Sequence, residues 1–144
     1  MTVANGYFAA WTEGVLDETV RMNTAVLKVA LVRGYTFSAG HKFVSDITTA
    51  GGMLNGTSAA LTGKTFVGGV FDADDTSVAS TVSTANHGWL LFQASAATGG
   101  ADVAAAVQRV IAWFDTGTGL PVQPGTGNAA LNWASTSPKI LKVG

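Results

Sequence analysis

Residues 24–33 read TAVLKVALVR, and this stretch decides the fold class. Valines, alanines and leucines fill it, and its first charged residue is Lys28. Apolar and β-branched residues in a short run favour a strand, and nearly continuous apolarity is typical of a strand that is buried on both faces. We therefore expect residues 24–33 to form a central strand of a sheet.

Outward from this stretch, short β-like runs recur between clusters of glycine and other turn residues. They cover residues 53–61, 64–70, 76–82, 89–94, 107–115, 129–134 and 139–143. No long helical pattern alternates with them, which disfavours a parallel βαβ architecture. About eight short strands with turn signals between them predict a mainly β fold, an antiparallel sandwich or barrel.

Three segments carry more specific predictions. Simple alternation in residues 107–115 (VQRVIAWFD) places Val110, Ala112 and Phe114 on one face of the strand and Arg109, Ile111 and Trp113 on the other. Residues 41–47 predict a single helical turn, with Ser38 as its cap. Residues 98–106 predict a loop.

The first 23 residues have helical rather than alternating spacing. Residues 5–18 (NGYFAAWTEGVLDE) predict a short helix with Asn5 as its N-cap, although Gly14 weakens the helix by roughly 1 kcal/mol relative to alanine. An apolar stripe recurs along this helix, formed by Tyr7, Phe8, Trp11 and Val15. A helix this short is marginal alone, so the stripe must dock on the core of the domain or on a neighbouring subunit.

Length and composition indicate one domain. A chain of 144 residues is usual for a single domain. We therefore expect residues 1–144 to form one β domain, with residues 1–23 as a helical docking segment and residues 24–144 as the β-sandwich. Hydrophobic residues make up 47% of the chain and charged residues 12%, so much of the surface must be neutral. A neutral surface repels neighbours poorly and suits packing against other subunits.

The charge pattern disfavours several classes of partner. The net charge is −1 and the eight Lys and Arg residues are scattered, whereas contacts to nucleic acid or anionic membranes need a basic patch. The chain has no cysteine, and therefore neither a disulfide nor a thiolate metal site. The first residues lack a signal-peptide pattern, and no run approaches the roughly 20 apolar residues of a membrane span. We expect a soluble protein that is made without export.

The sequence lacks the common catalytic motifs. Its two histidines, His41 and His87, are expected to be solvated near turns. No G-x-S-x-G, P-loop or G-x-G-x-x-G pattern occurs. Trp89, Trp113 and Trp133 lie in predicted strands, where core packing is favoured over stacking on sugars or bases. We therefore expect no enzyme activity, no catalytic residues and no cofactor.

Asp72, Asp74 and Asp75 form the one sequence cluster in which cation binding must be weighed. Three carboxylates within four residues offer oxygen ligands of the kind that Ca²⁺ prefers. An EF-hand loop starting at Asp72 would need glycine and glutamate at the positions where Ser77 and Ser83 stand, so an EF-hand is excluded. A solvated turn is the favoured interpretation, and a different calcium site is the alternative.

Four stretches of the β region together carry a family resemblance. They are residues 24–32 (TAVLKVALV), 35–43 (YTFSAGHKF), 60–75 (ALTGKTFVGGVFDADD) and, most specifically, 109–124 (RVIAWFDTGTGLPVQP). Through them the chain resembles a family of small virion-associated proteins encoded beside the capsid genes of tailed phages, especially phages of actinobacteria. The resemblance extends over most of residues 20–143. Residues 98–106 and 132–138 depart from the family pattern, which affects edges and partner contacts rather than core strands.

The resemblance implies a capsid decoration (cement) protein that binds the outer surface of the phage head and stabilises it. Its partners would be the major capsid protein and further copies of itself, in a closed homo-oligomer such as a trimer. It would be made in the cytoplasm of the bacterial host and located on the virion surface. The candidate interface with the capsid or another partner is the stripe Tyr7, Phe8, Trp11 and Val15. The alternative is a phage tail component or a module that binds a host receptor or glycan.

Overall fold

The computed structural model describes residues 6–80, 85–116, 120–124, 127–135 and 140–142. The predicted N-cap Asn5 lies outside the described residues. So do the ends of the predicted strands 76–82 and 139–143, and residues 117–119 of the stretch that carries the family resemblance.

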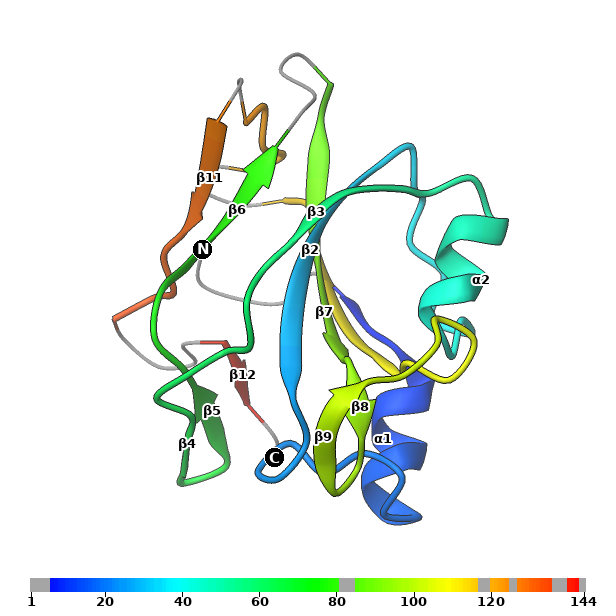
Figure 1. Ribbon diagram of the computed structural model, residues 1–144, viewed down its shortest axis with the longest axis vertical. Coiled ribbons are helices and arrows are strands. Elements are labelled where there is room, and N and C mark those ends of the chain that lie inside the picture. Colours follow the sequence, from blue (N-terminus) through cyan, green and yellow to red (C-terminus); the bar gives the residue numbers. More distant parts are fainter. Residues whose placement is uncertain (1–5, 81–84, 117–119, 125–126, 136–139, 143–144) are drawn as a thin grey trace.

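A five-stranded antiparallel sheet forms the centre of the molecule (Figure 1). Its strands lie in the order β1 (Gly6–Tyr7), β10 (Val110–Phe114), β7 (His87–Gln93), β2 (Leu27–Arg33) and β3 (Met53–Thr57). Each neighbouring pair is antiparallel. Strand β2 is the strand expected within residues 24–33, and it lies between β7 and β3 as a central strand should.

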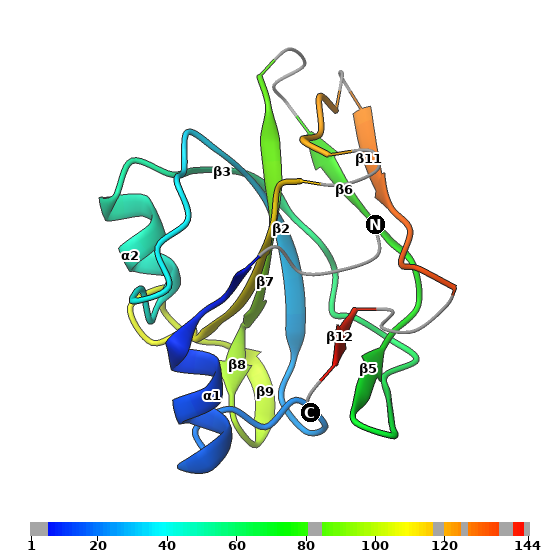
Figure 2. The ribbon, with the colours of Figure 1, turned by 180° about the vertical axis from the view of Figure 1, so that it is seen from behind.

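Two smaller sheets and two helices cover the faces of the central sheet. β6 (Thr76–Ser80) pairs with β11 (Gly127–Leu131), and β5 (Val70–Asp72) lies between β4 (Thr65–Val67) and β12 (Leu141–Lys142). Figures 1 and 2 show these strands on one side of the central sheet and α2 (Val44–Thr49) on the other. Helix α1 (Ala9–Leu16) lies at the lower right of Figure 1, and its Trp11 packs in the cluster of the small sheets. A hairpin of β8 (Ser95–Ala96) and β9 (Gly99–Asp102) continues from the end of β7. The predicted fold, mainly β and antiparallel with a short N-terminal helix, is confirmed, with twelve strands in the described residues.

Each face of the central sheet buries its own hydrophobic cluster. Along β2, Leu27, Val29 and Leu31 pack with residues of the small sheets, whereas Ala30 and Val32 pack in a second cluster with residues of α2. Strands β7 and β10 are buried along their whole length. Because successive side chains of a strand point to opposite faces, burial of both faces requires the nearly continuous apolar runs of the sequence.

The predicted faces of residues 107–115 are wrong, because β10 contains an irregularity. Val110 pairs with Phe92 and Ala112 with Leu91, so Ile111 is an extra residue between two successive pairs. Such a bulge shifts the alternation by one residue. Val110 and Trp113 therefore pack in the cluster on the side of α2. Ile111, Ala112 and Phe114 pack in the cluster on the side of the small sheets.

The N-terminal helix begins later than predicted. Residues 6–7 form β1 on β10, and the N–H of Phe8 donates to the carbonyl of Ile111. Helix α1 therefore begins at Ala9, and residues 6–8 of the docking segment 1–23 attach it to the main sheet and core. Gly14 is buried in α1, and a Cβ at this position would collide with the side chain of Val20. Gly14, which weakens the helix, thus leaves room for the side chain of Val20 to pack against α1.

One further predicted strand and one predicted loop also differ from the structure. The run 64–70 is not one strand, because Gly68 and Gly69 divide it into β4 and β5. Their φ angles of 60° and 76° are the left-handed values that a two-residue hairpin turn requires. Residues 98–106 contain β9 and are not a loop throughout.

The helical turn predicted at residues 41–47 is α2, and Asp46 rather than Ser38 caps it. The backbone N–H groups of Lys42 and Phe43 donate to Oδ2 of Asp46 at 2.8 and 3.0 Å. Both bonds favour the charged carboxylate and hold the pKa of Asp46 below its ordinary value. The bond from Lys42 has the larger effect. The carboxylate thereby fixes the start of the helix that covers one face of the sheet.

We expect Asp46→Asn to remove part of the acid sensitivity of the fold. Because the folded-state pKa of Asp46 is lowered, its contribution to stability is complete above the ordinary aspartate pKa and is lost as the pH falls through the folded-state value. Urea unfolding near pH 7 and near pH 3 measures this contribution. The wild type should lose more free energy of unfolding on acidification than the variant, and equal losses would contradict the assignment.

Gly88→Ala tests the packing of the central sheet. A Cβ at Gly88 would collide with the indole of Trp113, which is itself buried with its ring centroid 5.0 Å from that of Tyr35. Overpacking of this kind costs about 1–3 kcal/mol, which urea denaturation measures directly. Gly40→Ala is the matched control, because no described atom lies within 4 Å of its Cβ position. A loss for Gly88→Ala as small as that of the control would contradict the packing.

Candidate docking surface

Two of the four residues of the predicted interface stripe lie in the protein's own core. Phe8 is fully buried against Phe37, and Trp11 is 6% exposed. Tyr7 and Val15 are 38% and 49% exposed. Phe8 and Trp11 therefore stabilise the domain, and Tyr7 and Val15 are the members of the stripe that a partner can reach. The interface itself stays a prediction.

An apolar groove lies between α1 and the β4–β5 hairpin. It consists of two hollows with volumes of about 460 and 170 Å³, and Trp11, Met22 and Phe66 line both of them. The other lining residues are Val15, Val20, Arg21 and Asn23 in the larger hollow and Gly69, Val70, Phe71 and Leu141 in the smaller one. We refer to these residues as the apolar groove.

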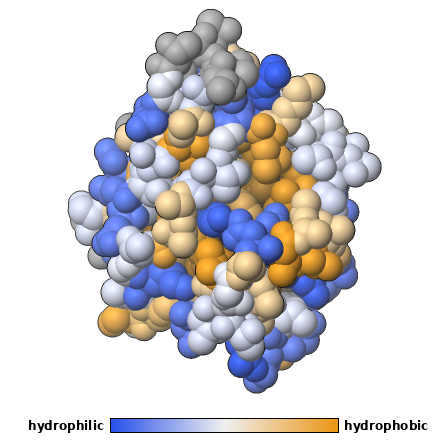
Figure 3. Space-filling model, in the orientation of Figure 1, coloured by the Kyte–Doolittle hydropathy of each residue, from blue (hydrophilic) through white to orange (hydrophobic). Residues whose placement is uncertain are grey.

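The two elements beside the apolar groove carry further exposed apolar side chains. Leu16, at the end of α1, is 87% exposed, and Val67, beside Phe66 in β4, is 76% exposed. Figure 3 shows apolar side chains at the lower left, where Figure 1 places the β4–β5 hairpin. Arg21 pairs with Glu18, which neutralises the charge next to the larger hollow. Exposed apolar side chains around a hollow are typical of a protein–protein contact.

Lys64 fixes the loop that forms one wall of the apolar groove. Its ammonium group donates to the carbonyls of Met22, Asn23 and Ala25 at 2.9, 3.3 and 2.8 Å. Burial lowers the pKa of Lys64 below its ordinary value. The three carbonyls replace water around the ammonium and tie the segment between α1 and β2 to the start of β4.

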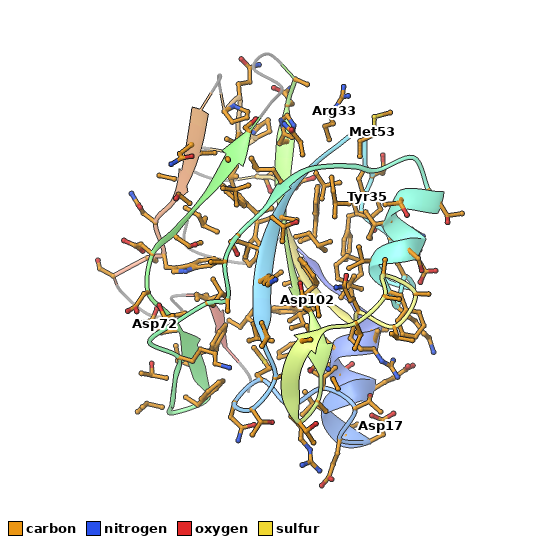
Figure 4. All side chains as sticks on the ribbon, in the orientation of Figure 1. Asp17, Arg33, Tyr35, Met53, Asp72 and Asp102 are labelled. Carbon is orange, nitrogen blue, oxygen red and sulfur yellow. The ribbon has the colours of Figure 1, made fainter. Side chains whose placement is uncertain are left out.

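The acidic run Asp72, Asp74 and Asp75 is engaged in loop contacts. Oδ2 of Asp74 accepts a hydrogen bond from Thr62 at 2.8 Å, and Oδ1 of Asp75 accepts the backbone N–H of Trp133 at 2.8 Å. Asp72 lies in β5, at the left of Figure 4. Within the described residues, no three His, Asp or Glu side chains are grouped so that they could hold a metal ion. The carboxylates of Asp74 and Asp75 instead fix the connection from β5 to β6.

His87 is buried, which contradicts the expectation that it is solvated. It is 1% exposed, with Nδ1 2.7 Å from the carbonyl oxygen of Ala85 and Nε2 3.0 Å from Nδ2 of Asn55. Since the carbonyl can only accept, Nδ1 is the donor in the contact with Ala85. Asn55 also donates to Oγ of Ser80 at 2.9 Å. The cluster thus joins β3, β6 and β7 and has a structural role.

His41 is partly buried and belongs to a second polar network. The hydroxyl group of Tyr35 accepts the N–H of Ser38 at 3.1 Å and shares a hydrogen bond with Nδ1 of His41 at 2.9 Å. Burial raises the pKa of Tyr35 above its ordinary value. The network holds the connection from β2 to α2 against the core.

A third hollow, of about 310 Å³, lies beside β8 and has a more polar lining. The guanidinium group of Arg109 covers the ring of Phe43, 5.1 Å from its centroid. Gln93 accepts the N–H of Arg21 and donates to the carbonyl of Thr19. These polar groups are engaged by the protein itself, so the apolar groove is the better candidate for a binding surface.

The sequence prediction includes only the helical half of this surface. Leu16, Phe66 and Val67 are missing from it, although Phe66 lines both hollows of the apolar groove. A signal for the hairpin is present in the sequence, because the pair Gly68–Gly69 separates two short apolar runs, TFV and VFD. No sequence signal places this hairpin beside α1, since that contact forms only in the folded domain.

Comparison of the chain with protein-family models, with curated proteins and with solved structures finds no match. Neither helix in the described part of the chain is long and apolar enough to span a bilayer. The candidate site therefore depends on its own geometry, which is a hollowed and weakly charged apolar surface. Such a surface suits contact with another protein.

We expect Lys64→Met to destabilise the wall of the apolar groove. The variant keeps most of the side-chain volume but leaves the partly buried carbonyls of Met22 and Ala25 without their donor, at a cost of about 1–3 kcal/mol. Urea denaturation measures the loss. Lys42→Met is the matched control: its ion pair with Glu13 is half-exposed and should contribute less than about 1 kcal/mol. Equal effects of the two substitutions would contradict the role of Lys64.

Proposed function

We propose that this protein is a capsid decoration (cement) protein, which binds the outer surface of a tailed-phage head and stabilises it. Its partners in this proposal are the major capsid protein and further copies of itself. It has no catalytic activity and needs no cofactor. The observation that carries the proposal is the exposed apolar surface around the apolar groove, on a chain with few charged residues.

The shape of this surface supports docking on another protein. The apolar groove, which Val15 lines, can receive apolar side chains of a partner. Leu16 and Val67 are further exposed apolar side chains on the two elements beside it. Because α1 is fixed to the core by Phe8 and Trp11, these side chains are held in place before binding. Preorganisation of this kind lowers the entropic cost of association.

The repetitive nature of a capsid also supports the proposal. A shell offers many equivalent positions, and copies that contact both the shell and one another bind more tightly than a single contact allows. A modest apolar patch is sufficient under these conditions. The stability of such a subunit must come from packing, because the chain has no cysteine to form disulfides; the two buried clusters of the central sheet meet this need.

The location and copy number of the protein in purified phage particles test the proposal. We expect quantitative mass spectrometry to find a copy number comparable to that of the major capsid protein, and cryo-electron microscopy to place the domain on the outside of the head. A few copies at the tail would contradict decoration and support a tail component or host-binding module. Absence from particles would contradict both functions.

Val15→Lys should weaken binding to particles from which the protein has been removed. A charge placed at an apolar contact loses its hydration on binding, and we expect at least about a tenfold loss of affinity in a co-sedimentation assay. Met53→Lys is the matched control, because Met53 is 55% exposed and lies at the opposite end of the molecule from Asp17, which follows α1 (Figure 4). Equal binding of the two variants would contradict docking through the apolar groove.

A further inference from the structure

Strand β4 ends a row of apolar side chains that crosses its sheet. Leu141, Phe71 and Phe66 occupy one register position on β12, β5 and β4. The exposed fraction rises along the row from 1% at Leu141 and 4% at Phe71 to 46% at Phe66. Phe66 stacks on Phe71 with the ring centroids 5.2 Å apart. The row is therefore covered on the side of β5 and uncovered at the outer edge of β4.

The backbone of Phe66 directs its hydrogen-bonding groups toward this outer edge. The carbonyl of Phe71 accepts the N–H of Ile140, so the polar groups of Phe71 point toward β12. Phe71 and Phe66 consequently form a non-hydrogen-bonded pair, and the N–H and carbonyl of Phe66 point away from β5. Within the described residues, β5 is the only strand that pairs with β4.

β4 lacks the features that usually protect an open edge. Proteins commonly block such edges with lysine, proline or a bulge. The strand consists of Thr65, Phe66 and Val67, which are uncharged and exposed. The preceding Lys64 is turned inward onto the carbonyls of residues 22, 23 and 25. Figure 1 shows β4 at the periphery of the molecule, where another chain can approach it.

We propose that β4 pairs with β4 of a second copy of this chain, antiparallel and centred on Phe66. The arrangement is self-complementary, because two residues in a hydrogen-bonded antiparallel pair exchange both N–H···O bonds, and here both residues are Phe66. The three strands of each copy then form one continuous sheet, and each Phe66 covers the open side of the other. Thr65 of one copy lies opposite Val67 of the other, and no charges are brought together.

The contact is short, so the dimer in solution should be weak. Stable interfaces bury about 800 Å² on each partner, and a strand of three residues with its neighbouring side chains covers less. Copies that are also held on a shell gain a high effective concentration, which strengthens such a contact. The inference thus names a self-association surface of the proposed particle subunit and rests on the proposed function for this setting only.

Disulfide crosslinking of purified variants tests the pairing and its register. The chain has no cysteine, so Thr65→Cys and Val67→Cys each carry a single thiol. In the proposed pair, positions 65 and 67 of the two copies are directly opposed at about 4.5 Å between Cα atoms, within disulfide reach. Two copies of the same variant place their cysteines diagonally, about 7–8 Å apart. We expect an oxidised mixture to form covalent dimers at least about tenfold faster than either variant alone.

Met53→Cys provides the matched control, because Met53 is exposed on β3, which is an edge strand of the central sheet. Mixed with Val67→Cys, it should form no covalent dimer above the rate of random collision, and thermal unfolding should show that all the reduced variants are folded. If the mixture of Thr65→Cys and Val67→Cys gains no rate over the single variants, the pairing is overturned. If each cysteine variant forms covalent dimers faster alone than in the mixture, the antiparallel register is overturned. No particle is present, so the result is independent of whether the protein is found on the capsid.

Discussion

The structure depends on the burial of both faces of strands β2, β7 and β10. Removal of apolar surface from water is the main favourable contribution to folding, at about 25 cal/mol per Å². A sheet that is apolar on both faces must be covered on both, and in this protein the small sheets and Trp11 of α1 cover one face, whereas α2 covers the other. A helix of eight residues and a hairpin of two short strands are marginal on their own. They are stable here because they complete the burial of the central sheet.

The central part of this arrangement can be predicted from local sequence. Continuous apolar runs such as residues 24–33 and 89–94 show directly that both faces of a strand are buried. The alternation of β10 cannot be predicted in this way, because the bulge at Ile111 depends on its pairing with β7. Long-range contacts likewise convert residues 6–7 from the start of a helix into an edge strand. The buried ring of His87 has its hydrogen-bond partner Asn55 32 positions away, on another strand of the sheet.

The candidate site, too, can be predicted from the sequence only in part. The helical stripe is readable from spacing, but spacing does not say which of its members face the core. Phe8 and Trp11 face inward and fix α1, and this leaves Tyr7 and Val15 at the surface. The other half of the apolar groove comes from the β4–β5 hairpin, more than forty residues away in sequence, and from the loop that Lys64 holds in place. The surface is therefore a product of tertiary structure, formed where α1 meets the small sheet.

In the function we propose, α1 and the β4–β5 hairpin form the surface through which this protein joins a larger particle. Hydrogen–deuterium exchange followed by mass spectrometry can locate this surface by comparing the free protein with the protein bound to phage heads. Binding should slow exchange mainly in residues 9–16 and 65–72. Protection confined to β3, α2 or the β8–β9 hairpin, with unchanged exchange in residues 9–16 and 65–72, would contradict it.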